Sequence, residues 1–184
     1  MRSYNYSFVL VLCMTMFLFL EGCIYSSITE PNKNIQDYNE LFDLELYSDK
    51  EVYKTTDNIN IWATLKYKGK DNKIEIWHGK PYIVFSISDG KEFNISGMIN
   101  TILTSTTLEK NRVYTFNYIK SGGYANSDPN AEYWKKFYDE KDLHLPKGEY
   151  TVKVNGAFSL YENDKNGKND KKGLSKELNI FVKE

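Results

Sequence analysis

The chain of 184 residues is poor in the residues that bind nucleic acids or metals or that form disulfides. It has two cysteines, two histidines and a net charge of −1 at pH 7. Arg2 and Arg112 are the only arginines among 24 basic residues, so the guanidinium groups that recognise phosphates and base edges are almost missing. These shortages argue against nucleic acid as a partner. The 41% of hydrophobic residues predict a folded domain with its own core.

The first 22 residues have the features of a signal peptide. Met1-Arg2 gives a positive start, and the 13 residues 8–20 form an apolar run. A transmembrane helix needs about 20 residues to cross the hydrocarbon layer, so this run is typical of a signal peptide instead.

The sequence Leu20-Glu21-Gly22-Cys23 resembles the lipobox of bacterial lipoproteins, in which a small residue precedes the lipidated cysteine. Glu21 stands at the most tolerant position of that motif. We expect cleavage after residue 22 and a diacylglyceryl group on Cys23 that holds the protein on the extracytoplasmic face of the cell membrane, because two lipid chains give stable anchoring. An ordinary cleaved signal with a secreted product, or an uncleaved N-terminal anchor, are the alternatives.

The predicted mature chain begins at Cys23, has lost Cys13 and therefore forms no internal disulfide. An exported protein without disulfides fits the surface of a Gram-positive bacterium. Residues 23–41 are mostly polar without a sustained period, which predicts a flexible tether.

From Phe42 to the C-terminus, alternating patterns between turn signals predict an all-β domain, an immunoglobulin-like antiparallel β-sandwich over residues 42–184. Ile59, Ile61, Ala63, Leu65 and Tyr67 share one face of a strand. Further strands are expected at 42–46, 74–78, 82–88, 91–95, 98–108, 113–118, within 145–154 and at 178–182. Pro81 is expected to end a strand, and Asp89-Gly90 to form a two-residue type I′ turn.

One segment breaks this pattern, because residues 128–138 predict a short inserted helix. Asp128 is a suitable N-cap, Pro129 fits the first helical position, and aromatic residues recur at a spacing of four. Interfaces favour such large rings, and a short helix cannot bury all of them against one sheet. The candidate partner-binding residues are Tyr118, Tyr124, Tyr133, Trp134, Phe137 and Tyr138. The alternative is that Trp134 and Phe137 cap the core of the sandwich.

Five segments together resemble a Bacillus-type family of surface lipoproteins (YhfM-like): residues 49–53 with the strand that follows, 85–90, 120–124 and 145–150. The layout is more distantly similar to the immunoglobulin-like domain of the Bacillus intracellular proteinase inhibitor, which also places a Pro-x-Gly-x-Tyr turn before a late strand. The resemblance implies a fold and a compartment, and almost nothing about molecular activity.

The inventory of residues argues against an enzyme. Only His78 and His144 could act as a general base, no mature cysteine is free to be a nucleophile, and the spacing of the histidines matches no zinc motif. We expect both histidines to be structural, and we expect no cofactor. Residues 162–173 offer oxygen ligands for calcium at Asn163, Asp164, Asn166, Asn169 and Asp170, but four lysines in the same segment favour a solvated loop.

Three functions stay open on the sequence alone. A lipid-anchored binding or adaptor module, with an extracytoplasmic protein or glycan as its partner, is the first. An inhibitor of extracytoplasmic proteases is the second, on the distant resemblance, and a structural envelope lipoprotein without a ligand is the third.

Overall fold

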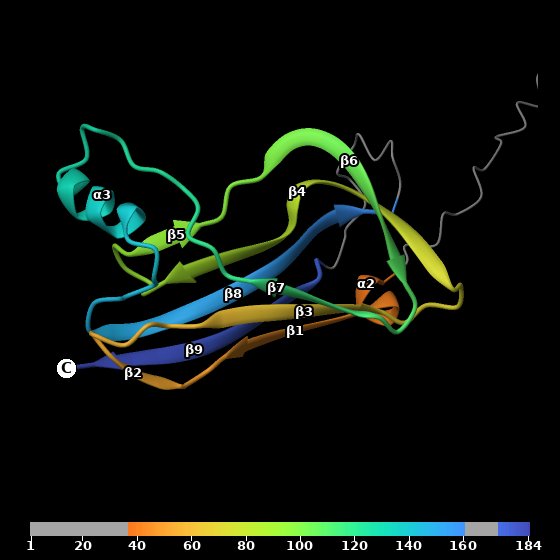
Figure 1. Ribbon diagram of the computed structural model, residues 1–184, viewed down its shortest axis with the longest axis horizontal. Coiled ribbons are helices and arrows are strands. Elements are labelled where there is room, and N and C mark those ends of the chain that lie inside the picture. Colours follow the sequence, from red (N-terminus) through yellow and green to blue (C-terminus); the bar gives the residue numbers. More distant parts are fainter. Residues whose placement is uncertain (1–36, 161–172) are drawn as a thin grey trace, which may run out of the picture. The chain divides into compact units, whose positions relative to one another are not determined.

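The computed structural model describes residues 37–160 and 173–184, and within them the chain is all-β with two short helices (Figure 1). The helices are α2 (Tyr38–Leu41) and α3 (Ala131–Asp139). The strands are β1 (Phe42–Ser48), β2 (Val52–Lys54), β3 (Ile61–Tyr67), β4 (Lys73–Ser88), β5 (Asn94–Ser96), β6 (Asn100–Glu109), β7 (Val113–Asn117), β8 (Gly148–Ser159) and β9 (Ser175–Lys183).

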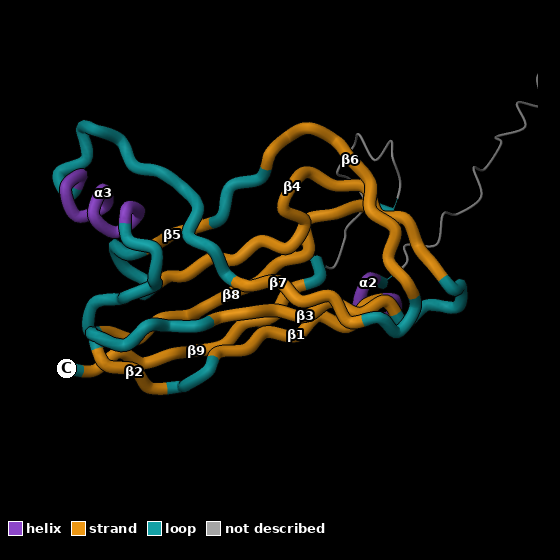
Figure 2. The backbone as a smooth tube through the Cα atoms, in the orientation of Figure 1, coloured by secondary structure: helices purple, strands orange, loops and turns teal. Residues whose placement is uncertain are grey.

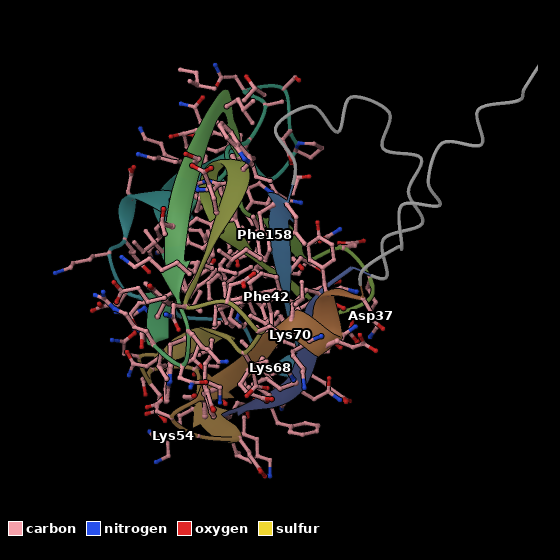
Figure 3. The ribbon with its side chains drawn as sticks, turned by 90° about the vertical axis from the view of Figure 1, so that its right-hand side faces the viewer. Asp37, Phe42, Lys54, Lys68, Lys70 and Phe158 are labelled. Carbon is pink, nitrogen blue, oxygen red and sulfur yellow. The ribbon has the colours of Figure 1, made fainter. Side chains whose placement is uncertain are left out.

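The described strands form two sheets with one hydrophobic core between them. The smaller sheet has the order β1-β3-β7, and the larger has the order β2-β9-β8-β4-β5 with β6 also paired to β4. Phe42 of the smaller sheet meets Phe158 of the larger one edge to face, with ring centroids 5.1 Å apart (Figure 3). The predicted all-β class is confirmed.

The alternation that predicts the strands matches their burial. Every second residue of β3, from Ile61 to Tyr67, is buried, while its neighbours are half-exposed. Tyr150, Val152 and Val154 of β8 are buried in the same way, because successive side chains of a strand point to opposite faces. The Tyr150 hydroxyl donates a hydrogen bond of 2.9 Å to the carbonyl of Pro146, which fixes the turn that leads into β8.

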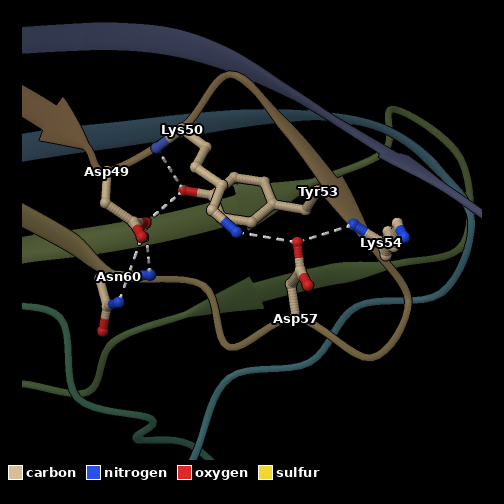
Figure 4. A network of polar contacts seen from close by, with 6 residues as sticks. All are labelled: Asp49, Lys50, Tyr53, Lys54, Asp57 and Asn60. Atoms are coloured by element: carbon tan, nitrogen blue, oxygen red, sulfur yellow. Dashed lines mark hydrogen bonds and ion pairs between the residues drawn. The ribbon is translucent and has the colours of Figure 1, made fainter.

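One pairing departs from the prediction that all strands run antiparallel. Residues Val52–Lys54 of β2 pair in parallel with Phe181–Lys183 of β9. Figure 4 shows the polar network that fixes the segment around β2: the Tyr53 hydroxyl donates to the carboxylate of Asp49 at 2.6 Å, and the Lys50 ammonium binds Asp57 at 3.0 Å. These contacts turn the chain between β1 and β3, so that β2 reaches the opposite sheet.

Pro81 does not end a strand as predicted, because β4 continues through it to Ser88. The register of β4 shifts next to Pro81, between His78 and Lys80 against β6 and between His78 and Ile83 against β8. A residue without an N–H is tolerated at such an irregularity. The Lys80-Pro81 peptide bond is cis.

β6 and β5 pair with successive stretches of one edge of β4. Gly79 lies against the backbone carbonyl of Asn100 in β6, where a Cβ atom would not fit.

The predicted two-residue turn at Asp89-Gly90 is wrong, because five residues, Asp89 to Phe93, connect β4 to β5. Gly90 has a positive φ of 71° and Asp89 does not, whereas a type I′ turn requires both. The Asp89 carboxylate accepts hydrogen bonds from the backbone N–H groups of Lys91 and Phe93. This wider loop carries the ring of Phe93 into the core.

The inserted helix is confirmed between β7 and β8 (Figure 2), but it begins at Ala131 rather than near Asp128. The Asp128 carboxylate accepts from the N–H of Asn130 at 2.7 Å and so forms a turn before the helix.

The tether predicted over residues 23–41 ends too late, because α2 lies within that range. Tyr38 and Leu41 of α2 are buried in the core.

Several predictions fall outside the described residues: the signal peptide, Cys23, the tether up to residue 36 and nearly all of the proposed calcium loop. In the described ranges, no helix is long and apolar enough to span a membrane. The same ranges contain no group of three or more His, Cys, Asp or Glu side chains that could hold a metal ion.

Candidate functional site

The structure brings the six predicted binding residues together in one aromatic cluster, but it turns most of them inward. Phe137 is only 5% exposed, so its prediction as a contact residue is wrong. Its ring packs edge to face on Phe93 at 5.8 Å, and Trp134 covers the same phenylalanine at 5.6 Å. Phe93 also contacts Tyr150 of β8. The helix therefore caps one end of the core through Phe93.

The tyrosines of the aromatic cluster are held by one another. Tyr118 packs against Phe85 at 5.8 Å, and burial raises the pKa of its hydroxyl far above the ordinary value. Tyr124 stacks on Tyr138 with centroids 6.4 Å apart. Tyr133, 41% exposed, is the most accessible large ring of the helix. Little of this cluster is free to contact a partner.

Lys120 fastens the end of the helix to the chain that leads into it. Its ammonium lies 4.7 Å from the centroid of the Phe137 ring and donates to the Phe137 carbonyl at 2.5 Å. The last carbonyls of a helix have no partner within the helix, and a cation there is favourable. Burial lowers the pKa of Lys120, although Glu140 and Asp142 oppose this shift. The role of the lysine is therefore to stabilise α3.

Four large exposed apolar residues lie close together in the sequence on residues 97–103, which we call the arch. The arch joins β5 to the paired part of β6 and stands above β4 (Figure 1). Its exposed side chains are Met98 at 64%, Ile99 at 42%, Ile102 at 73% and Leu103 at 55%. Isolated exposed hydrophobic residues are ordinary, but a group of this kind indicates an interaction surface.

A groove of about 460 Å³ opens beside the arch, and we call it the apolar groove. Its lining includes Pro81, Ile83 and Phe85 of β4, Met98 of the arch, and Phe116 and Tyr118 at the end of β7. Ile119, which is 77% exposed, forms part of its rim. The groove therefore lies where the edge of the smaller sheet faces the larger one.

The sequence contains a signal for the arch that a strand prediction over residues 98–108 overlooks. Met98-Ile99 and Ile102-Leu103 are adjacent apolar pairs, and neighbouring residues of a strand face opposite sides. One member of each pair must therefore point outward. In the structure both members do, because β6 is regularly paired with β4 only from Thr104 onward.

Both histidines have polar partners. His78 is 3% exposed, with Nδ1 2.7 Å from the carbonyl of Gly79 and Nε2 2.8 Å from the hydroxyl of Thr106. A carbonyl only accepts, so Nδ1 donates and Nε2 accepts from Thr106. His144 is half-exposed and lies 3.5 Å from the Glu140 carboxylate.

No family model and no curated protein sequence matches the chain. Among solved structures, it is similar to a β-glucosidase from Erythrobacter marinus at 13% identity and a TM-score of 0.40, over 77% of this chain and 15% of that one. It is also similar to the sporulation control protein Spo0M from Bacillus subtilis, at 14% identity and a TM-score of 0.36, over 78% of this chain and 50% of that one. A β-glucosidase from Listeria innocua is similar at 10% identity and a TM-score of 0.37, over 77% of this chain and 16% of that one. The chain thus spans half or less of each of these proteins.

These likenesses are too distant to carry an argument about function. They do not bear on the resemblance to the YhfM-like lipoproteins or on whether the protein is an enzyme.

Proposed function

We propose that the protein is a lipid-anchored extracytoplasmic binding or adaptor module of a bacterial cell surface, and that the arch and the apolar groove bind its protein partner. The observation that carries this proposal is the group of four exposed apolar side chains on the arch, beside a groove lined by Phe85 and Phe116. The proposed fold class is an immunoglobulin-like sandwich, and membership of the YhfM-like family is part of the same proposal.

The occupant that fits this surface is an extended protein segment with apolar side chains. β7 has one strand neighbour, β3, among the described residues, so its other edge is open to pairing. Natural edge strands are usually protected by charges or proline, but the sequence of β7, Val-Tyr-Thr-Phe-Asn, contains neither. A segment added to β7 would satisfy these backbone groups and place side chains in the apolar groove.

The opposite edge of the smaller sheet is protected. β1 carries Asp43 and Glu45, and Glu45 forms an ion pair of 3.3 Å with Lys176 of β9. A binding strand is therefore favoured at β7 and disfavoured at β1.

Capture after surface crosslinking in the native bacterium tests the binding face. We expect wild type to capture a protein that the Ile102→Ser/Leu103→Ser variant loses. Val52→Ser is the matched control, because Val52 is 46% exposed but belongs to β2, outside the arch, the apolar groove and β7. Equal capture by the arch variant would contradict the proposed face. A captured protease would favour the inhibitor alternative, and the absence of any partner would favour a structural envelope protein.

Anchoring is tested separately by feeding cells an alkyne-labelled palmitate analogue. We expect the label on wild type and its loss in Cys23→Ser, together with release of the protein from the membrane fraction. A labelled Cys23→Ser variant would place the lipid on another residue. An unlabelled wild type would support an ordinary cleaved signal peptide or an uncleaved N-terminal anchor.

A further inference from the structure

A second recess, which we call the polar cleft, adjoins the apolar groove at Asn117, Tyr118 and Ile119 but differs from it in chemistry. It has a volume of about 490 Å³, within the range of about 300–1,000 Å³ that is usual for small-molecule sites. Residues 58–62, the chain after β7 and residues 141–143 line it. Its polar side chains and the indole of Trp62 distinguish it from the surface that we assign to a protein partner.

One wall of the polar cleft comes from an alternating stretch of sequence. Ile59 and Ile61 are buried, at 3% and 4% exposed, whereas Asn58, Asn60 and Trp62, which alternate with them in the sequence, are exposed or half-exposed. The chain before β3 and the start of β3 therefore bring two amides and one indole to the lining of the cleft.

The Trp62 side chain is held in place from one side. Tyr47 is its cross-strand partner on β1, and the two rings stack with centroids 5.6 Å apart and planes 18° from parallel. On its other side Trp62 pairs with Asn117 of β7, which also lines the polar cleft. The indole is thus supported by Tyr47, and an amide lies next to it on the side of the cleft.

The amide of Asn60 has a fixed orientation. Its Nδ2 donates to the Asp49 carboxylate at 3.3 Å, so its carbonyl oxygen points away from Asp49 (Figure 4). Burial alone would raise the pKa of Asp49, but hydrogen bonds from Tyr53 and Asn60 outweigh it and hold that pKa below its ordinary value. Asp49 therefore stays an acceptor at neutral pH, and Asn60 presents a hydrogen-bond acceptor of its own.

We infer that the polar cleft binds a saccharide. The apolar C–H face of a pyranose ring stacks on the indole of Trp62, and hydroxyl or acetamido groups bond to the amides of Asn58, Asn60 and Asn117. Amides both donate and accept, which matches sugar hydroxyls. Lys120 and Lys141 also line the cleft, but the Lys120 ammonium donates to the Phe137 carbonyl and Asp142 adds a carboxylate. With no arginine in the lining, a phosphate is matched less well than a neutral sugar.

Titration calorimetry on the full-length protein in detergent tests this assignment, with chitotriose, cellotriose and maltotriose as probes. We expect at least one trisaccharide to bind with millimolar or better affinity. Trp62→Ala should weaken that binding by at least about tenfold, Trp62→Phe should retain part of it because a ring is kept, and Asn117→Ala should weaken it less than Trp62→Ala.

Tyr133→Ala is the matched control, because it removes an exposed ring outside the polar cleft and should leave the affinity unchanged. Absence of binding for all three sugars, or equal affinity in Trp62→Ala and wild type, overturns the assignment. An effect of Tyr133→Ala as large as that of Trp62→Ala overturns the location. Each of these outcomes is independent of the capture experiment on the arch.

Discussion

The aromatic cluster and the arch show opposite relations between composition and exposure. The cluster contains six aromatic residues in 21 positions, from Tyr118 to Tyr138, yet Phe137 is 5% exposed and most of the other rings are half-buried. The arch contains no aromatic residue, yet its apolar side chains are 42–73% exposed. A high density of aromatic residues in a sequence therefore does not indicate an exposed surface. The exposed fraction of each side chain depends on whether neighbouring elements of the fold cover it.

The largest effect in this comparison is expected for Phe137→Ala. A buried phenylalanine replaced by alanine loses its packing and leaves a cavity, which costs about 3–5 kcal/mol. Urea unfolding of the variant should show this loss in the free energy of unfolding. The matched control is Tyr133→Ala on the same helix, which should cost far less. Equal, small losses in both variants would mean that the helix does not belong to the core.

Gly79→Ala is expected to affect the base of the arch without changing any exposed residue on it. A Cβ atom at position 79 meets the backbone carbonyl of Asn100, so the two strands must separate, at a cost of about 1–3 kcal/mol. Gly123→Ala is the control, because nothing lies within 4 Å of the added atom. Amide exchange should accelerate in residues 99–103 of the first variant alone. Unchanged amide exchange in residues 99–103 would show that the arch does not depend on the close approach of Gly79 to Asn100.

Tyr150→Phe should cost about 1 kcal/mol, because it removes the hydrogen bond to the Pro146 carbonyl. It should also change the alkaline stability. Burial raises the pKa of Tyr150 to about 12 from an ordinary value of 10.0, so the folded state keeps a proton that the unfolded state releases. Stability is then fully present below pH 10 and falls as the pH rises to 12.

Urea unfolding between pH 9 and 12 measures this dependence, and the phenylalanine variant should lose less stability over the range than wild type. Parallel curves for the two proteins would contradict the assignment. Tyr53, whose pKa burial also raises to about 12, contributes in the same direction in both proteins.

The smallest effect on stability is expected for the Ile102→Ser/Leu103→Ser variant. Both side chains are exposed, so each substitution should change the free energy of unfolding by less than about 0.5 kcal/mol. Chemical unfolding checks this, together with the partner capture described above. A large destabilisation would show that the arch packs against the domain instead of serving a partner.

The sequence allowed prediction of the strands whose pattern is local. Residues Ile61–Tyr67 alternate clearly, and their burial follows from that alternation alone. The parallel pairing of Val52–Lys54 with Phe181–Lys183 could not be predicted, because it depends on contacts between the two ends of the domain.

The inward packing of the aromatic cluster depends on one loop that the sequence pattern did not predict. The observed five-residue connection from Asp89 to Phe93 carries the Phe93 ring to Trp134 and Phe137. The burial of the helix was therefore decided by the backbone of another segment. The adjacent apolar pairs of the arch were visible in the sequence, but only the missing regular pairing before Thr104 leaves both members of each pair exposed.

The position of β9 has a consequence for the order in which the protein folds. The strand lies between β2 and β8, far along the chain from β2, so the larger sheet gains its link to β2 only when Ser175–Lys183 have been synthesised. Contacts so distant in sequence form late and slowly. A chain emerging from the ribosome therefore lacks this link until β9 has emerged. An exported protein of the kind we propose can still be threaded across a membrane in that open condition.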